Sequence, residues 1–251
     1  MTTEHKRALV FIQQRLGSSR LPKKALAKIG HTTMTEHVIS RATAGVGDWN
    51  RVVMGVPYKD FRDLSTGSCQ VYGIRGDETD LVRRMIRSVE MMEADWPLGR
   101  ADVIVRITGD TPLLPPRLIK DTIKECKRFG GYIYTRHDPS DRPDGIDVQA
   151  MCRDTFETLK TMHGSMTPEE REHITPALMK YAQHKRMLTH GGSVLLGNIP
   201  YFDVSVDTEH DLKRVRRVWD FLSKTDGKDY QPSLTDLIYA RLAKPEIFVD
   251  S

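Results

Sequence analysis

The 251-residue chain carries 38 Lys and Arg against 34 Asp and Glu, which gives a formal net charge of +4. Hydrophobic residues make up 39% of it, too many for a disordered tail, and the length allows the core of one large domain. No run approaches the ~20 apolar residues that a membrane-spanning helix needs. Three cysteines without metal-ligand spacing and an N-terminus without a secretory apolar segment predict a reduced, cytoplasmic protein. The mild basic excess fits either nucleic acid or a pocket for a small polyanion.

Short apolar runs alternate with segments of helical periodicity along the chain. This alternation predicts an α/β fold in which a mostly parallel, Rossmann-like central sheet carries helices on both faces. We expect the whole chain, residues 1–251, to form a single domain. The predicted strands are 8–12, 51–56, 70–74, 102–107, 132–134, 145–150 and 202–206. The predicted helices are 35–44, 78–94, 116–129, 167–184, from 207 or 208 to 222, and 234–242.

A basic loop follows the first predicted strand. It contains Arg15, Arg20, Lys23 and Lys24 together with a glycine and two serines. Backbone N–H groups, hydroxyls and cationic side chains in one loop suit the binding of a triphosphate. The loop is neither a P-loop nor a dinucleotide fingerprint, because both glycine signatures are absent. Composition alone leaves a solvated basic loop as the alternative.

Two carboxylates follow predicted strands that lie far apart in the sequence. Asp110 comes after the strand 102–107, and Asp207 comes after the strand 202–206. Ligands of parallel α/β sheets bind at the carboxyl ends of strands, and carboxylates are preferred ligands of Mg²⁺. The two side chains could converge on one metal ion. Alternatively, Asp207 caps the following helix.

The segment from Val10 to Leu26 resembles the signature loop of the sugar cytidylyltransferases. It is most similar to the SpsF-like, spore-coat polysaccharide branch, which is related to the CMP-KDO and CMP-sialic acid synthetases. Five further blocks, in the family's order, are 75–82, 105–113, 142–148, 171–176 and 206–212. Two positions depart from the pattern, since Gln14 stands where the family usually has alanine and Lys23 where it usually has glycine.

The resemblance implies a single nucleotidyltransferase domain that transfers CMP from CTP to a sugar or sugar acid and releases pyrophosphate. It implies Mg²⁺ as cofactor, a homodimer, and a role in making nucleotide sugars for glycan synthesis. Residues 131–201 are expected to contribute to the acceptor site and the dimer contacts. Neither a membrane nor a nucleic acid is an expected partner.

The resemblance also implies a role for individual residues. The implied nucleotide-binding residues are Gln13, Arg15, Gly17, Ser18, Ser19, Arg20, Lys24, Gly76, Asp77, Thr108 and Asp110. The implied acceptor-binding residues are Arg136, Asp144, Gly145, Asp147, Glu172 and His173. Asp110 and Asp207 would hold Mg²⁺, and with Arg15 and Lys24 they form the implied catalytic set.

Three alternatives remain at this point. An enzyme of the same fold could use UTP or accept a sugar phosphate, which Lys23 and the cations at 136, 137 and 142 would suit. A nucleic-acid-binding module is suggested by the charge alone, and the chain lacks an aromatic–basic platform for it. The third alternative is a non-catalytic nucleotide-binding protein, because a fold alone does not guarantee activity. The presence of both strand-end carboxylates argues against it. The charged run 213–217 is interpreted as a solvated helix face.

Overall fold

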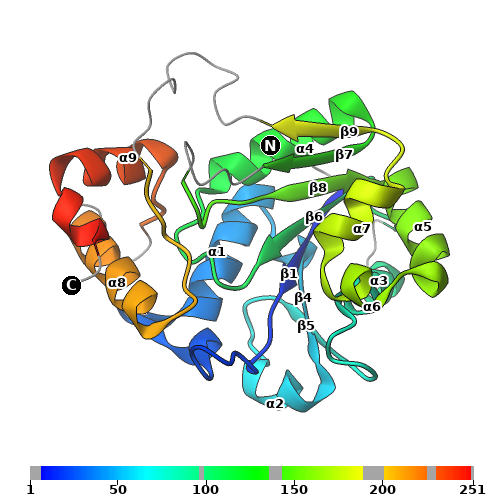
Figure 1. Ribbon diagram of the computed structural model, residues 1–251, viewed down its shortest axis with the longest axis horizontal. Helices are drawn as coiled ribbons and strands as arrows, with labels where there is room; N and C mark the ends of the chain where they lie inside the picture. Colours follow the sequence, from blue (N-terminus) through cyan, green and yellow to red (C-terminus); the bar gives the residue numbers. More distant parts are fainter. Residues whose placement is uncertain (1–6, 96–98, 136–142, 189–200, 225–229, 250–251) are drawn as a thin grey trace.

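A seven-stranded sheet in the order β5-β4-β1-β6-β8-β7-β9 forms the centre of the molecule (Figure 1). The structure is a computed structural model that describes residues 7–95, 99–135, 143–188, 201–224 and 230–249. The strands of this sheet are β1 (Ala8–Gln13), β4 (Val52–Pro57), β5 (Gln70–Ile74), β6 (Val103–Thr108), β7 (Tyr132–Thr135), β8 (Gln149–Cys152) and β9 (Lys185–Leu188). A separate two-stranded sheet consists of β2 (Lys28–Ile29) and β3 (Thr32–Thr33).

The strands β5, β4, β1 and β6 are parallel to one another, as are β7 and β9. Only β8 runs antiparallel to its neighbours β6 and β7. Parallel pairing places Gln13 beside Thr108, so the carboxyl ends of β1 and β6 meet at one edge of the sheet. The mostly parallel α/β sheet predicted from the sequence is therefore confirmed, and its strand ends define where a ligand would bind.

Helices cover both faces of the sheet (Figure 1). The α-helices are α1 (Met34–Val46), α2 (Phe61–Leu64), α3 (Leu81–Asp95), α4 (Pro116–Phe129), α5 (Arg153–Met162), α6 (Pro168–Glu172), α7 (Ile174–Tyr181), α8 (Glu209–Ser223) and α9 (Leu234–Ala243). The short 3₁₀ helices are η2 (Lys24–Leu26), η3 (Trp49–Arg51), η4 (Tyr58–Asp60), η5 (His163–Ser165) and η6 (Pro245–Phe248).

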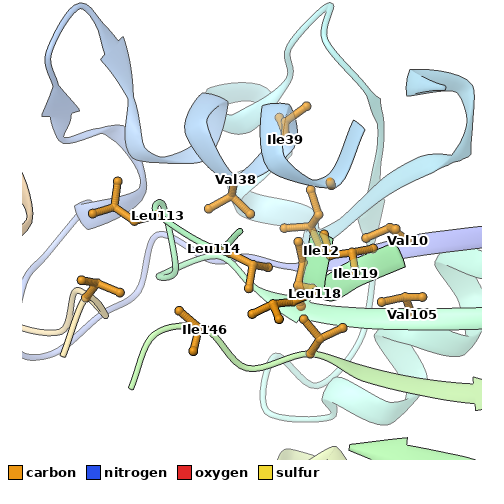
Figure 2. Close-up of a cluster of buried hydrophobic side chains, with 14 of the residues drawn as sticks. Val10, Ile12, Val38, Ile39, Val105, Leu113, Leu114, Leu118, Ile119 and Ile146 are labelled. Atoms are coloured by element: carbon orange, nitrogen blue, oxygen red, sulfur yellow. The ribbon is translucent and has the colours of Figure 1, made fainter. Parts of the chain in front are cut away.

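Two hydrophobic cores follow from the alternation of side chains along the strands. Val10 and Ile12 of β1 belong to the core under α1, α4, α8 and α9, and Figure 2 shows them beneath Val38. Leu9 and Phe11 belong to the core under α3, α5 and α7. Burying a side chain of this size contributes roughly 1.5–3 kcal/mol, so a central strand that is apolar on both sides is firmly held.

The helix predicted over 167–184 is wrong, because the structure has two helices there. His173 adopts φ −118° and ψ 101°, which separates α6 from α7. Pro176 explains the break, since a proline has no N–H to donate and its ring clashes with the carbonyl four residues earlier, that of Glu172. The proline is tolerated in the first turn of α7 instead.

Two predicted strands also differ from the structure. A strand is predicted at 145–150, but the strand that enters the sheet is β8, residues 149–152. The segment 202–206 forms one isolated bridge, between Asp144 and Asp203. The two segments run side by side, with Asp144 N donating to Phe202 O at 2.9 Å and Val204 N donating to Asp144 O at 3.1 Å. These hydrogen bonds hold the segment that precedes α8 against the segment that precedes β8.

Thr208, and not Asp207, caps α8. The Thr208 hydroxyl accepts from Asp211 N, and the Asp211 carboxylate accepts from Thr208 N at 2.7 Å and from Asp207 N at 3.0 Å. Arg214, only 5% exposed, pairs with both Asp211 and Asp203 at 2.7 Å. The interpretation of 213–217 as a solvated helix face is therefore wrong for Arg214, which lies inside the molecule.

In the described ranges, the structure has no helix that is both long enough and apolar enough to cross a membrane.

The close crossing of the two segments leads to a prediction for Gly145. Its φ is +82°, and a Cβ there would lie 2.3 Å from Ser205 N. We expect Gly145→Ala to lower the free energy of unfolding by more than about 2 kcal/mol, because left-handed backbone strain adds to the steric clash. Denaturant unfolding measures this. Gly164→Ala, with open space around its Cβ, is the control, and equal losses in the two variants would contradict the account.

The Asp211 carboxylate gives a prediction that depends on pH. Burial alone raises the pKa of Asp211, but hydrogen bonds from Thr208 and Asp207 and the charge of Arg214 outweigh it and lower the pKa. We expect Asp211→Asn to cost about 1–3 kcal/mol of unfolding free energy at pH 7. A carboxyl group with a lowered pKa in the folded state stabilises that state above its unfolded pKa of about 4. The difference in unfolding free energy between Asp211→Asn and wild type should therefore shrink as the pH falls below that value.

Unfolding curves of both proteins between pH 7 and pH 3 check this expectation. Asp220→Asn, at an exposed position of the same helix, should behave like wild type throughout. A loss for Asp211→Asn that does not change with pH would contradict the electrostatic explanation.

Candidate functional site

A polar cavity of about 300 Å³ opens where β1 and β6 end. The basic loop after β1, the loop after β6 and the segment before α8 form its walls. The lining residues are Gln13, Gln14, Arg15, Ser18, Ser19, Arg20, Lys24, Thr108, Gly109, Asp110 and Asp207. The cavity brings together most of the residues predicted for the nucleotide and both carboxylates predicted for the metal.

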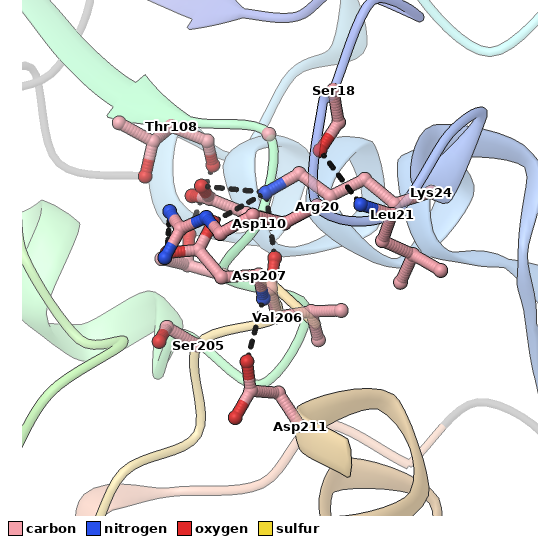
Figure 3. A network of polar contacts seen from close by, with 12 residues as sticks. Ser18, Arg20, Leu21, Lys24, Thr108, Asp110, Ser205, Val206, Asp207 and Asp211 are labelled. Carbon is pink, nitrogen blue, oxygen red and sulfur yellow. Dashed lines mark hydrogen bonds and ion pairs between the residues drawn. The ribbon is translucent and has the colours of Figure 1, made fainter. Parts of the chain in front are cut away.

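The Lys24 ammonium lies at the centre of three oxygen atoms (Figure 3). Its Nζ is 3.2 Å from Asp110 Oδ2, 2.8 Å from Asp207 Oδ1 and 2.6 Å from the carbonyl oxygen of Val206. The Lys24 side chain is 11% exposed, whereas the two carboxylates are 31% and 37% exposed. The carboxylates therefore reach the cavity while the lysine holds them from beneath.

Asp110 and Asp207 meet because their backbones are also joined. Val206 N donates to Asp110 O at 2.9 Å, which fixes the segment before α8 to the end of β6. Arg20 adds a further ion pair to Asp207 at 2.7 Å. Since Thr208 is the helix cap, the Asp207 side chain is left to face these cations.

Asp60, which is not among the residues predicted from the sequence, holds the basic loop in place. Its carboxylate accepts a hydrogen bond of 2.9 Å from Leu16 N, and the residue is only 4% exposed. Asp60 lies in η4, directly after β4, so its position at a strand end is the signal that could have indicated it. Within the loop, Leu16 O accepts from Ser18 N and Lys23 N at 2.9 and 3.2 Å.

The two departures from the family pattern have visible consequences. Gln14 is buried and donates to Gly109 O at 3.0 Å, so it ties the loop after β1 to the loop after β6. A Cβ on Gly109 would lie 2.3 Å from the Gln14 amide nitrogen, which explains the glycine there. Lys23 adopts φ 57°, a left-handed conformation that favours glycine. A lysine there bears a backbone strain of roughly 1–2 kcal/mol that glycine avoids.

The remaining predicted residues that the structure describes do not line this cavity. Gly17 lies on the exposed side of the basic loop, and Gly76 and Asp77 form the turn after β5, where Asp77 accepts from Thr79 N at 2.9 Å. Asp144 accepts from Gly145 N at 2.7 Å at the crossing described above.

The predicted acceptor residues are spread over several elements. Glu172 ends α6, and the exposed His173 separates α6 from α7. Asp147 lies close enough to Arg106 to act on it electrostatically. Arg136 lies outside the described residues. The structure thus brings together most of the predicted nucleotide residues and both predicted metal residues, but not the described members of the acceptor set.

The sequence matches the model of the cytidylyltransferase family over residues 9–189. The spore coat polysaccharide biosynthesis protein SpsF of Bacillus subtilis is 31% identical over 215 residues, which cover 84% of this chain and 85% of that protein. The 3-deoxy-manno-octulosonate cytidylyltransferase of Nitrobacter hamburgensis is 32% identical over 120 residues, 47% of this chain. That match spans 44% of the enzyme's length, less than half of it.

Solved structures show the same fold. A cytidylyltransferase from Leptospira borgpetersenii superposes with a TM-score of 0.77 at 20% identity and 98% coverage of both chains. A CMP:2-keto-3-deoxy-manno-octonic acid synthetase in complex with CTP gives 0.59 at 17% identity, covering 86% of this chain and 99% of that one. A Mycobacterium tuberculosis protein in complex with manganese gives 0.53 at 15% identity, covering 84% and 98%.

The family match covers well over half of the chain, and it includes the basic loop, the end of β6 and the segments between them. The SpsF relative is similar over 84% of the chain, more than the family model covers. The resemblance seen in the sequence is thereby confirmed, and the chain belongs to the cytidylyltransferases, a family of nucleotidyltransferases.

Proposed function

We propose that the protein transfers CMP from CTP to a hydroxyl of a sugar or sugar acid, with Mg²⁺ as cofactor and pyrophosphate as the second product. The observation that carries the proposal is the Lys24 ammonium held between Asp110 and Asp207 in a cavity that Arg15 and Arg20 also line. The relative named for 3-deoxy-manno-octulosonate supports an acidic sugar as the acceptor, and the fold neighbour solved with CTP supports the nucleotide.

The residues at the centre of the cavity fit a divalent cation. Two carboxylate oxygens and the Val206 carbonyl already surround a positive charge, and hard oxygen ligands are those that Mg²⁺ prefers. Among the described residues no group of three or more His, Cys, Asp and Glu side chains could hold a metal. Phosphate oxygens of the nucleotide would therefore complete the ligand set. When bound, the metal would neutralise charge on those phosphates.

The transfer forms one bond and breaks one. The acceptor oxygen bonds to the α-phosphorus, the bond from that phosphorus to the bridging oxygen breaks, and pyrophosphate leaves with the electron pair. The proton of the acceptor hydroxyl passes to solvent. Arg15 and Arg20 neutralise the departing phosphates, and the hydroxyls of Ser18 and Ser19 orient them. Positioning and charge neutralisation of this kind supply most of the catalysis in phosphoryl transfer.

Pyrophosphate release tests the proposal directly. The assay pairs each of the four nucleoside triphosphates with acidic sugars, sugar phosphates and neutral sugars in the presence of Mg²⁺. We expect release with CTP and at least one sugar. Release with UTP, or with a sugar phosphate alone, would establish the alternative substrates instead. Folded, metal-supplied protein that releases none with any pairing would refute the activity.

The homodimer, the cytoplasmic location, the single domain and the contribution of residues 131–201 to an acceptor site and dimer contacts stay predictions. Sedimentation of the purified chain would test the predicted homodimer.

Asp110→Asn provides a specific prediction. Turnover should fall by about two orders of magnitude or more, the scale of a lost electrostatic group in a transition state. The melting temperature should change little, because Asp110 is partly exposed and Asp207 still pairs with Lys24. Asp121→Asn, an exposed carboxylate on α4, is the control and should keep wild-type turnover. Near-normal turnover of Asp110→Asn would remove the support for its metal role.

Lys24→Met tests whether the lysine competes with a metal for the two carboxylates. We expect the variant without nucleotide to bind Mn²⁺ at least about tenfold more tightly than wild type, since an adjacent positive charge is removed. Turnover should fall, because the triphosphate loses a cation. Isothermal titration with Mn²⁺ alone gives the affinities, and the melting temperature verifies that the variant folds.

Lys23→Met is the matched control for this experiment. It removes the same charge one residue away, keeps a side chain at the left-handed position, and touches neither carboxylate in the structure. Mn²⁺ affinity that is unchanged in Lys24→Met, or raised equally in both variants, would refute the competition.

A further inference from the structure

Arg106 is an enclosed cation whose described partners are uncharged. It lies on β6, and its guanidinium donates from Nε to Gln13 Oε1 at 2.9 Å, from Nη2 to the same oxygen, and from Nη1 to Gln149 Oε1 at 2.8 Å. Asp110 and Asp147 act on it electrostatically, but within the described ranges no carboxylate forms an ion pair with it. Enclosed charges in proteins are normally paired, so an unpaired guanidinium marks a place where an anion belongs.

The guanidinium has donors to spare. Arginine carries five N–H groups, and three are used here, which leaves one on each terminal nitrogen. Two parallel N–H groups of this kind bind carboxylate or phosphate in a bidentate way. The uncharged amides of Gln13 and Gln149 hold the side chain without neutralising it.

An unpartnered hydroxyl lies next to this cation. Tyr132 of β7 is fully buried, and its hydroxyl has no hydrogen-bond partner in good geometry. Arg106 and Tyr132 are close enough to influence each other electrostatically. The neighbouring Thr175 hydroxyl, which accepts from Gln149 Nε2 at 2.7 Å, interacts with the Tyr132 hydroxyl but does not form a hydrogen bond of normal geometry with it. A buried hydroxyl without a partner destabilises the protein, and a ligand oxygen placed there would remove that cost.

Arg106 lies directly behind one wall of the cavity. Gln13 and Thr108 line the cavity and are register partners across β1 and β6. Arg106 precedes Thr108 by two residues, so both side chains point to the same face of the sheet, the face that α3, α5 and α7 cover. The guanidinium therefore lies one hydrogen bond away from a side chain that lines the cavity.

We propose that Arg106 is a specificity-determining residue, which with the Tyr132 hydroxyl recognises an acid group, carboxylate or phosphate, on the acceptor. The assignment rests on the proposed nucleotidyl transfer and narrows it, since a neutral sugar would leave the guanidinium unpaired. Gln13 and Gln149 are positioning residues that present the guanidinium to the acceptor.

The test compares wild type with Arg106→Gln in the pyrophosphate assay, with CTP and three acceptors: 3-deoxy-manno-octulosonate, mannose 1-phosphate and mannose. The KM for the acid acceptor should rise about tenfold or more, as expected for a lost hydrogen bond to a charged group, while the KM for CTP stays within about twofold. Arg106→Lys, which restores the charge but not the fork, should recover part of the loss.

Arg41→Gln is the structural control. Arg41 is also buried, but it donates to the carbonyl oxygens of Pro112 and Tyr230 and packs in the other core. Its replacement should lower stability and leave the acceptor KM unchanged. If Arg106→Gln raised the acceptor KM no more than Arg41→Gln does, Arg106 would be merely structural and the assignment would be overturned.

A binding experiment separates failure of this assignment from failure of the proposed function. The melting temperature of each variant is measured with CTP alone and with each acceptor alone. A rise with an acidic acceptor in wild type that is lost in Arg106→Gln supports the assignment, even if no pyrophosphate is released, and the better acid identifies carboxylate or phosphate. The assignment of Arg106 is overturned if only mannose supports turnover or raises the melting temperature, or if neither acid raises it. Turnover of CTP with mannose would still support the proposed nucleotidyl transfer.

Discussion

Two carboxylates from distant segments face each other at the end of the sheet, and electrostatics requires a cation between them. Lys24 supplies it, within 3.2 Å of Asp110 and 2.8 Å of Asp207. Because the lysine belongs to the basic loop, one ammonium joins that loop, the end of β6 and the segment before α8. The fold brings these three segments together. Parallel pairing of β1 with β6 aligns the first two segments, and the crossing at Gly145 brings in the third.

Behind this centre each partly enclosed acid lies next to a base. Arg20 pairs with Asp207, whose backbone N–H donates to Asp211, and Asp211 shares Arg214 with Asp203. A charge removed from such a series leaves its neighbour unpaired in a medium of low dielectric constant. Asp211, Arg214 and Asp203 therefore help to set the geometry of a cavity that they do not line, and Asp60 has the same function for the basic loop.

The sequence predicts what depends on local pattern and misses what depends on distant partners. Apolar runs predict β1, β4 and β6 because a parallel central strand is buried on both faces. Strand ends followed by polar residues indicate the cavity, including Asp110 and Asp207. Pro176 was a local signal for the break between α6 and α7, and the helical periodicity concealed it. Arg214 and Arg106 could not be assigned, since a charge run and a strand residue look the same in sequence whether solvated or enclosed.

The alternation of side chains along β1 divides the site into two halves. Gln14 bonds to Thr35 of α1 and to Gly109, on one face of the sheet, whereas the neighbouring Gln13 bonds to Arg106 on the other. In the proposed reaction the phosphate cations lie in the loop that Gln14 anchors, and the acid group of the acceptor lies against Arg106. In-line displacement requires the attacking oxygen and the leaving oxygen on opposite sides of the phosphorus. Consecutive residues at the end of a strand point to opposite faces, so in the proposed reaction the acceptor and the departing pyrophosphate would lie on the two sides that Gln13 and Gln14 face.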